Sequence, residues 1–199
     1  MKIIGITGGI GSGKSKVLNF FSNKDIPCYN SDYQSKNLVN SDSKIKKEII
    51  KHFGDKIYCS GELDSKALSK LVFSNSEYLK KLNSIVHPAV NNDFNKFIKN
   101  NNNSSLIFKE SAILFESESY LLCDYIVLIT APVKIRVKRV IKRDLINVEQ
   151  VNSKISSQWS DEKKSKLSNK IISNIQWNKT VLLLENLLIE IKNKFNITD

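Results

Sequence analysis

The chain has 199 residues, 41% of them hydrophobic, which is enough for one domain with a sizeable core. No apolar run is as long as a membrane span and the first residues do not resemble a signal peptide, so we expect a cytoplasmic protein with no membrane partner. The net charge of +11 comes mostly from lysines spread along the chain, a pattern typical of a solvated surface, and three widely spaced cysteines indicate neither a disulfide framework nor a zinc site.

Short apolar segments alternate with helical patterns along the chain. We predict strands over residues 2–7, 26–30, 105–111, 123–131 and 169–174. We predict helices over residues 14–23, from Pro132 to residue 144, over 147–168 as one or two polar helices, and over 177–195. Residues 31–100 read as helical with breaks at 52–55, 59–64 and 86–90. This alternation predicts an α/β fold with a parallel sheet and a helical insertion after the second strand.

Residues 8–15, GGIGSGKS, match the phosphate-loop pattern G-x-x-x-x-G-K-[ST] between a predicted strand and a predicted helix. In such a loop the backbone N–H groups form an anion site, to which the helix N-terminus adds positive potential. Lys14 can reach the β- and γ-phosphates, and the Ser15 hydroxyl can bind Mg²⁺. The motif predicts a nucleoside triphosphate site, with a structural glycine turn as the alternative.

The phosphate loop does not identify the reaction. The sequence has no Asn-Lys-x-Asp guanine motif, which argues against a GTPase. The third strand lacks the Asp-Glu ending of many ATPases and ends in Lys109-Glu110-Ser111, where Glu110 is either a ligand beside Mg²⁺ or a strand-end acid. A small-molecule kinase needs a carboxylate near the acceptor hydroxyl. Asp32, just after the second strand, is the candidate, with a helix N-cap as the alternative.

Arginine is confined to one short segment. The chain has only Arg136, Arg139 and Arg143, all within residues 135–144, and their spacing places them on one helical face. The planar guanidinium is suited to phosphate, which favours a phosphate-binding helix over chance clustering on a solvated one.

Further motifs follow the phosphate loop in a recognisable order. They are Asp32, FG, G-x-LD, VHP, ILFE, Arg139-x-x-x-Arg143-Asp144, Gln158 and a short strand ending in Asn174. Together with TGGIGSGKS, this series resembles the bacterial dephospho-CoA kinase family over almost the whole chain. The resemblance implies ATP-dependent phosphorylation of the ribose 3′-hydroxyl of dephospho-CoA, giving coenzyme A and ADP in the last step of coenzyme A biosynthesis. It implies ATP and Mg²⁺ as co-substrate and cofactor.

The resemblance also implies an architecture. It is a P-loop NTPase-type three-layer fold with a five-stranded parallel sheet, a helical CoA-binding insertion and a small lid. The nucleotide-binding core is expected at about residues 1–30, 104–135 and 169–199, the substrate subdomain at about 31–103 and the lid at about 136–168. We expect a monomer or weak homo-oligomer that binds dephospho-CoA and ATP and no nucleic acid.

The family's site residues carry over by position. Asp32 matches the catalytic acid that takes or orients the hydroxyl proton, and Lys14 and Arg139 are the other expected catalytic residues. The residues expected to bind ATP are Gly9, Gly11, Ser12, Gly13, Lys14, Ser15, Lys16 and Arg143. The residues expected to bind the acceptor are Asp32, Lys36 and His87, and Ser15 is the expected metal ligand. The resemblance leaves the role of Arg136 open.

Five positions depart from the family pattern. The unusual residues are Lys16 for Thr, Asn30 for Asp, Lys36 for Arg, Ser65 for Arg and Asn169 for Asp. Lys16 is expected to contribute its backbone N–H, while Lys36 keeps the charge of arginine without its bidentate fork. We expect the change at Lys16 to leave function intact, and those at Asn30, Ser65 and Asn169 to weaken details of substrate binding rather than the resemblance itself.

Two other functions stay as alternatives. One is a nucleoside or nucleotide kinase with a different acceptor, which a panel of acceptors distinguishes. The other is a basic nucleic-acid-binding NTPase, which predicts salt-sensitive binding and ATPase stimulation by DNA or RNA. The diffuse lysines and the confined arginines argue against the second.

Overall fold

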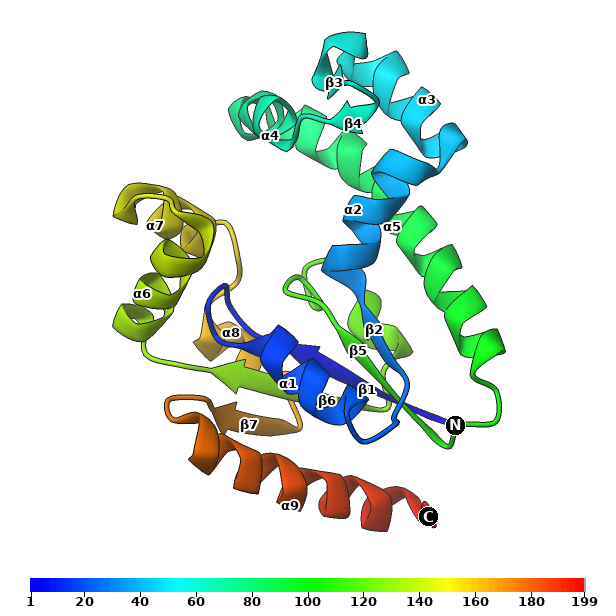
Figure 1. Cartoon of the computed structure of the whole chain (residues 1–199), viewed down its shortest axis with the longest axis vertical. Helices are drawn as coiled ribbons and strands as arrows, with labels where there is room; N and C mark the ends of the chain where they lie inside the picture. Colours follow the sequence, from blue (N-terminus) through cyan, green and yellow to red (C-terminus); the bar gives the residue numbers. More distant parts are fainter. Residues whose placement is uncertain (199) are drawn as a thin grey trace. The chain divides into compact units, whose positions relative to one another are not determined.

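The computed structural model describes residues 1–198, and for residues 73, 74 and 76 it describes the backbone only. The chain divides into two compact units (Figure 1). Unit 1 is Met1–Asn30 together with Asn101–Asp199, and unit 2 is Ser31–Asn100. Each unit is described by itself.

Unit 1 is built on a parallel sheet whose strands, among the described residues, number five in the order β2-β5-β1-β6-β7. The strands are β1 (Lys2–Thr7), β2 (Cys28–Asn30), β5 (Leu106–Glu110), β6 (Tyr125–Thr130) and β7 (Lys170–Ser173). The predicted five-stranded parallel sheet is therefore confirmed. Because all strands run the same way, their carboxyl ends meet at one edge, where open α/β sheets bind ligands.

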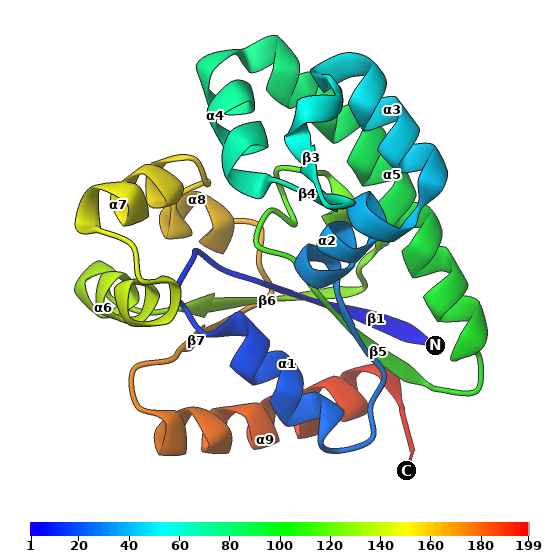
Figure 2. The ribbon, with the colours of Figure 1, turned by 45° about the horizontal axis from the view of Figure 1, so that its top comes forward.

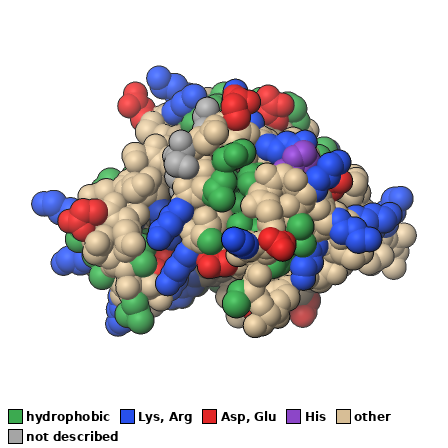
Figure 3. Space-filling model, turned by 90° about the horizontal axis from the view of Figure 1, so that it is seen from above, with side chains coloured by type: hydrophobic (Ala, Val, Ile, Leu, Met, Phe, Trp, Pro, Cys, Tyr) green, Lys and Arg blue, Asp and Glu red, His purple; other side chains and the backbone are tan. Residues whose placement is uncertain are grey.

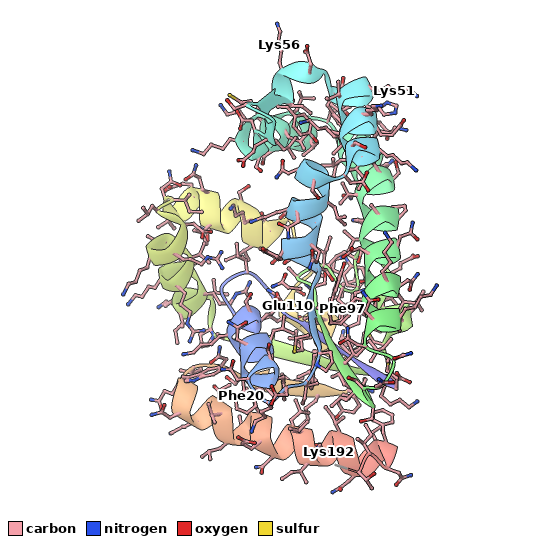
Figure 4. The ribbon with its side chains drawn as sticks, turned by 45° about the vertical axis from the view of Figure 1, so that its right-hand side comes forward. Phe20, Lys51, Lys56, Phe97, Glu110 and Lys192 are labelled. Carbon is pink, nitrogen blue, oxygen red and sulfur yellow. The ribbon has the colours of Figure 1, made fainter. Side chains whose placement is uncertain are left out.

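Helices cover both faces of this sheet. The helices of unit 1 are α1 (Lys14–Ser22), α6 (Val133–Asp144), α7 (Val148–Ser156), α8 (Asp161–Ser165) and α9 (Trp177–Phe195). In Figures 1 and 2, α1 and α9 lie on the same side of the sheet. Their apolar stripes share one core with alternate strand residues, in which Phe21 of α1 stacks on Phe108 of β5 with ring centroids 3.8 Å apart. Phe20 packs on that core beside α9 (Figure 4).

The opposite face of the sheet has a smaller core. Ile126 points away from its neighbours in β6, as alternation along a strand requires, and packs with Leu114 and Phe115. Trp159, which precedes α8, stacks on Phe115 at a centroid distance of 6.4 Å. The segment after β5, including a 3₁₀ turn at Ser119–Leu122, and α8 thus form the third layer.

Unit 2 is mainly helical. Its elements are α2 (Ser31–Ser41), α3 (Ser43–Phe53), a 3₁₀ turn (Asp55–Ile57), the hairpin strands β3 (Tyr58–Cys59) and β4 (Glu62–Leu63), α4 (Ser65–Ser74) and α5 (Ser76–Asn100). The side chains of Asp42 and Asp64 accept backbone N–H bonds at the starts of α3 and α4, which fixes where these helices begin. The helical breaks predicted at 52–55 and 59–64 are present, the second as a hairpin.

The break predicted at residues 86–90 is wrong. Helix α5 continues through Pro88, although proline removes one backbone hydrogen bond at a cost of about 3 kcal/mol. The helix packs against α2, α3 and α4, and Val86 and Val90 beside the proline are buried. Burial of two such side chains contributes about 3–6 kcal/mol, which offsets the proline.

One face of the molecule carries its charge diffusely. On the face drawn in Figure 3, lysine and arginine side chains are scattered over several elements rather than gathered into one patch. Within the described part of the chain, none of the helices combines the length and the apolar character that a membrane crossing requires.

Candidate functional site

The phosphate loop joins β1 to α1 at the carboxyl edge of the sheet in unit 1. Gly13 is the N-cap of α1 and has φ 95°, in the left-handed region that favours glycine. A Cβ at this position would also overlap the amide nitrogen of Asn174, which follows β7. A residue with a side chain is thus excluded here for two independent reasons.

The carbonyl groups of the loop are held on its outer side. Arg136 Nε donates to Ile10 O at 2.9 Å, and Asn174 Nδ2 donates to Ser12 O at 2.8 Å. Arg139 Nη1 lies 3.4 Å from Gly11 O. In a trans peptide the N–H points away from the C=O, so the N–H groups of Gly11 and Gly13 face the opposite side. That arrangement of N–H groups is what an anion site requires.

The first residues of α1 meet the end of β5. Lys14 is the first residue of α1 and its side chain is buried. Ser15 Oγ donates to Glu110 Oε2 at 3.2 Å, and Asn30 Nδ2 donates to the same oxygen at 2.7 Å. Glu110 is the last residue of β5 (Figure 4). Its side chain is only 2% exposed. The structure therefore places Glu110 beside Ser15, the predicted metal ligand. The sequence left open whether Glu110 lies beside Mg²⁺ or is only an acid at the end of the strand.

Asn30 was missed as a site residue, although its departure from the family pattern was a signal. It pairs with Glu110 across the parallel strands β2 and β5. An aspartate here would face the Glu110 carboxylate with a second negative charge, whereas the asparagine amide donates a hydrogen bond to it. Asn30 can therefore lie beside the Glu110 carboxylate because its own side chain is an uncharged amide.

The three arginines of α6 do not act as one face. Arg139 is half-buried at the loop, and its Nη2 donates to Asn174 O at 2.9 Å and to Ile175 O at 3.2 Å. Arg143 is largely exposed and makes a bidentate ion pair with its neighbour Asp144, at 2.6 and 2.9 Å. The hydrogen bonds that Arg143 donates to the Asp144 carboxylate raise the pKa of Arg143. The structure thus brings Arg139, and not Arg143, into contact with the loop.

The side chain of Lys16 has a partner that the sequence did not indicate. Its Nζ lies 4.1 Å from the centroid of the Trp177 ring, at the start of α9. A cation over an indole face is attracted by the ring quadrupole. The lysine that departs from the family pattern is therefore directed to α9.

The candidate acceptor residues lie in unit 2. Asp32 is the second residue of α2, which rules out the N-cap alternative, and Lys36 is one turn further along the same helix, so the two exposed side chains share a face. A carboxylate in the first turn is favourable beside the helix dipole. His87 lies in α5, and burial lowers its pKa.

Another departure from the family pattern changes little. Asn169, which precedes β7, accepts the backbone N–H of Ile126 through its Oδ1 at 2.7 Å. Aspartate offers an oxygen in the same place. The remaining unusual residue, Ser65, is the first residue of α4.

Comparison with known proteins gives consistent matches. A family model described as dephospho-CoA kinase matches residues 2–179. A relative named dephospho-CoA kinase, from Bacteroides fragilis, is 38% identical over 171 residues, which are 86% of this chain and 83% of the relative. The crystal structure of a Thermus thermophilus protein has a TM-score of 0.85 and 30% identity, and the match covers 95% of this chain and 97% of that one. A dephospho-CoA kinase structure from Campylobacter jejuni, at 23% identity and a TM-score of 0.70 over 98% of this chain and 99% of that one, bears on the fold alone.

Proposed function

Because this chain belongs to the dephospho-CoA kinase family, and is therefore a kinase of the final step of coenzyme A biosynthesis, we propose how its own residues perform that reaction. The γ-phosphoryl group of ATP is transferred to the 3′-hydroxyl of the dephospho-CoA ribose. The observation that carries the proposal is the phosphate loop with its carbonyls bound on the outside by Arg136, Arg139 and Asn174. Such a loop presents N–H groups to phosphate.

ATP is held mainly by the loop and the start of α1. The proposed ATP-binding residues are Gly9, Gly11, Ser12, Gly13, Lys14, Ser15, Lys16 and Arg143. Lys14 is proposed to neutralise the β- and γ-phosphates, as the lysine of this motif does. Arg139 binds backbone carbonyls on the outer side of the loop in this structure, and we propose that it leaves them when the lid closes and then compensates charge on the transferred group. Arg143 contributes from the same helix after leaving Asp144.

The residues around Ser15 fit a magnesium ion. Among the described residues no group of three or more His, Cys, Asp or Glu side chains is arranged to hold a metal ion, but Mg²⁺ bound to a nucleotide needs only one or two protein oxygens. Ser15 Oγ and Glu110 Oε2, 3.2 Å apart, are such oxygens. We propose that Ser15 holds the ion and that Glu110 binds one of its waters. The ion supplies charge neutralisation at the phosphates.

Asp32 is the proposed catalytic carboxylate. It orients the 3′-hydroxyl and accepts its proton as the hydroxyl oxygen bonds to the γ-phosphorus and the bond to the bridging oxygen of ADP breaks. Lys36, one turn further on, and His87 are proposed to contact the acceptor. We assign the core to residues 1–30, 104–135 and 169–199, the acceptor subdomain to 31–103 and the lid to 136–168, whose closure excludes water.

We also propose the setting in which this enzyme acts. It works in the cytoplasm as a monomer or weak homo-oligomer, with no nucleic-acid or membrane partner. The diffuse surface lysines support the lack of a nucleic-acid partner, since nucleic-acid sites gather basic residues on one face.

The test is ADP release in a coupled assay with ATP, Mg²⁺ and a panel of acceptors. Dephospho-CoA should give turnover well above background; turnover only with a nucleoside monophosphate would contradict the proposed acceptor. Asp32→Asn should lower kcat by about 10²–10⁴-fold, the usual contribution of a general base. Asp55→Asn, an exposed aspartate of unit 2, is the matched control and should retain full activity. An unchanged kcat in Asp32→Asn would remove Asp32 from the chemistry.

A further inference from the structure

Arg136 is a buried cation to which the proposed reaction assigns no contact with ATP or the acceptor. It is 5% exposed, and its Nε donates to Ile10 O at 2.9 Å. Its Nη1 forms an ion pair with Asp161 Oδ2 at 3.1 Å. The guanidinium also packs so closely on Gly9 that a Cβ there would overlap it. Arg136 therefore links α8 to the outer side of the phosphate loop.

Gln158 binds the other backbone polar group of Ile10, its N–H. Ile10 N donates to Gln158 Oε1 at 2.9 Å. Gln158 follows the end of α7 and precedes α8, whose first residue is Asp161. Both backbone polar groups of Ile10 are thus held by side chains from the 136–161 segment, more than a hundred residues away in the chain.

We propose that Arg136, Gln158 and Asp161 form a clamp that fixes the peptide groups of Ile10 and so presets the phosphate loop for nucleotide. These are positioning residues, and the inference rests on the proposed nucleotide role of the loop. A segment with glycine at positions 8, 9, 11 and 13 has wide conformational freedom in the absence of restraints. Holding it in its bound form beforehand removes an entropic cost from binding.

The chemistry of the clamp explains why arginine is used. Arg136 meets Ile10 O through Nε and Asp161 through Nη1 at the same time. A lysine ammonium is a single point donor on a flexible stem and cannot hold this pair with fixed geometry. The bond to Asp161 aims the guanidinium, so Asp161 acts on the loop through Arg136.

The experiment compares Arg136→Lys, Arg136→Met and Gln158→Met with Lys138→Ala, an exposed cation on the same helix. Affinity for ADP is measured by titration calorimetry, and KM is measured separately for ATP and for dephospho-CoA. We expect Gln158→Met to weaken ADP affinity and raise the KM for ATP about tenfold, because one neutral hydrogen bond is lost. Arg136→Met should change the same two quantities by about 10–100-fold, because its hydrogen bonds are charge-assisted. Arg136→Lys should lie between Arg136→Met and the parent protein.

The KM for dephospho-CoA should stay unchanged in the Arg136 and Gln158 variants. Lys138→Ala should leave the ADP affinity and both KM values unchanged. A purely structural role would instead lower the melting temperature and the active fraction, with ADP affinity unchanged in the folded fraction. Hydrogen exchange of residues 8–13 without nucleotide gives a direct readout, and it should speed up in Gln158→Met. If Arg136→Met does not fold, Gln158→Met decides: unchanged ADP affinity with unchanged exchange would overturn the clamp.

The same data separate this inference from the proposed function. ADP binding needs no acceptor, so a clamp that tunes ADP affinity stands even where dephospho-CoA gives no turnover. Turnover of dephospho-CoA with ADP affinity insensitive to these variants would support the function and reject the clamp.

Discussion

The buried ion pair between Lys164 of α8 and Glu116 gives a quantitative test of what holds α8 to the rest of unit 1. Lys164 Nζ is fully buried, lies 3.0 Å from Glu116 Oε1 and donates to Ala112 O at 2.7 Å. Glu116 Oε1 also accepts the backbone N–H of Trp159 at 2.9 Å. Its second oxygen, Oε2, is buried without a hydrogen-bond partner among the described residues. The charge of the Glu116 carboxylate is therefore compensated mainly by the Lys164 ammonium.

The perturbation is Lys164→Met, which keeps the length of the side chain and removes its charge. Breaking a buried pair by removing one partner costs about 3–5 kcal/mol, because the other charge is left uncompensated. At about 2–4 °C per kcal/mol for a chain of this size, the melting temperature should fall by about 6–20 °C. In the double variant Lys164→Met/Glu116→Gln the charge is gone and the acceptor for Trp159 N is kept. At least about 2 kcal/mol of the loss should then be regained.

The assay is urea and thermal unfolding followed by circular dichroism at neutral pH. The matched control is Lys80→Met, because Lys80 pairs with Glu77 at a similar 2.9 Å but both side chains are 74% exposed. That surface pair should contribute less than about 1 kcal/mol. The reasoning is refuted if Lys164→Met costs no more than Lys80→Met, or if the double variant is as unstable as the single one.

Two further predictions concern residues of the candidate site. Lys16→Thr should change the KM for ATP less than about threefold, because the backbone N–H is kept, and should alter the fluorescence of Trp177 by removing the cation over its ring; a tenfold rise in KM would instead assign the ammonium to ATP. Burial lowers the pKa of His87 below 6.5, so the stabilisation from its neutral form is complete above pH 6.5 and is lost as the pH falls through the native pKa. His87→Gln should therefore flatten the decline of unfolding free energy as the pH falls below 6.5 in urea titrations, and an equal decline in both proteins would contradict this burial effect.

Local pattern was enough to predict the sheet and the phosphate loop. A short apolar run bounded by glycine predicted β1, and an amphipathic pattern predicted α9, both with the bounds that the structure shows. The glycine pattern predicted where β1 turns into α1. At Pro88 a local rule failed. The proline signals a break, but packing of α5 against the other helices of unit 2 outweighs one missing hydrogen bond.

Contacts between distant parts of the chain were not predictable from one sequence. Ile10 meets Gln158, and Ser15 meets Glu110, only because the fold brings them together across about a hundred residues or more. The arginine segment illustrates both sides of this limit. Helical spacing predicted that Arg136, Arg139 and Arg143 share one helical face, but burial and local partners gave each of them a different environment.

The position of β1 has a consequence for how the chain assembles. This strand lies between β5 and β6, so Lys2 pairs with Leu106 and Ile4 with Tyr125. A ribosome that has made β1 must add roughly another hundred residues before either neighbour exists, whereas unit 2 is contiguous and has its own helix contacts. Pairings so distant in sequence form slowly and leave an apolar segment exposed meanwhile. Until β5 and β6 have been made, the emerging chain therefore carries KIIGIT as an apolar segment without strand partners.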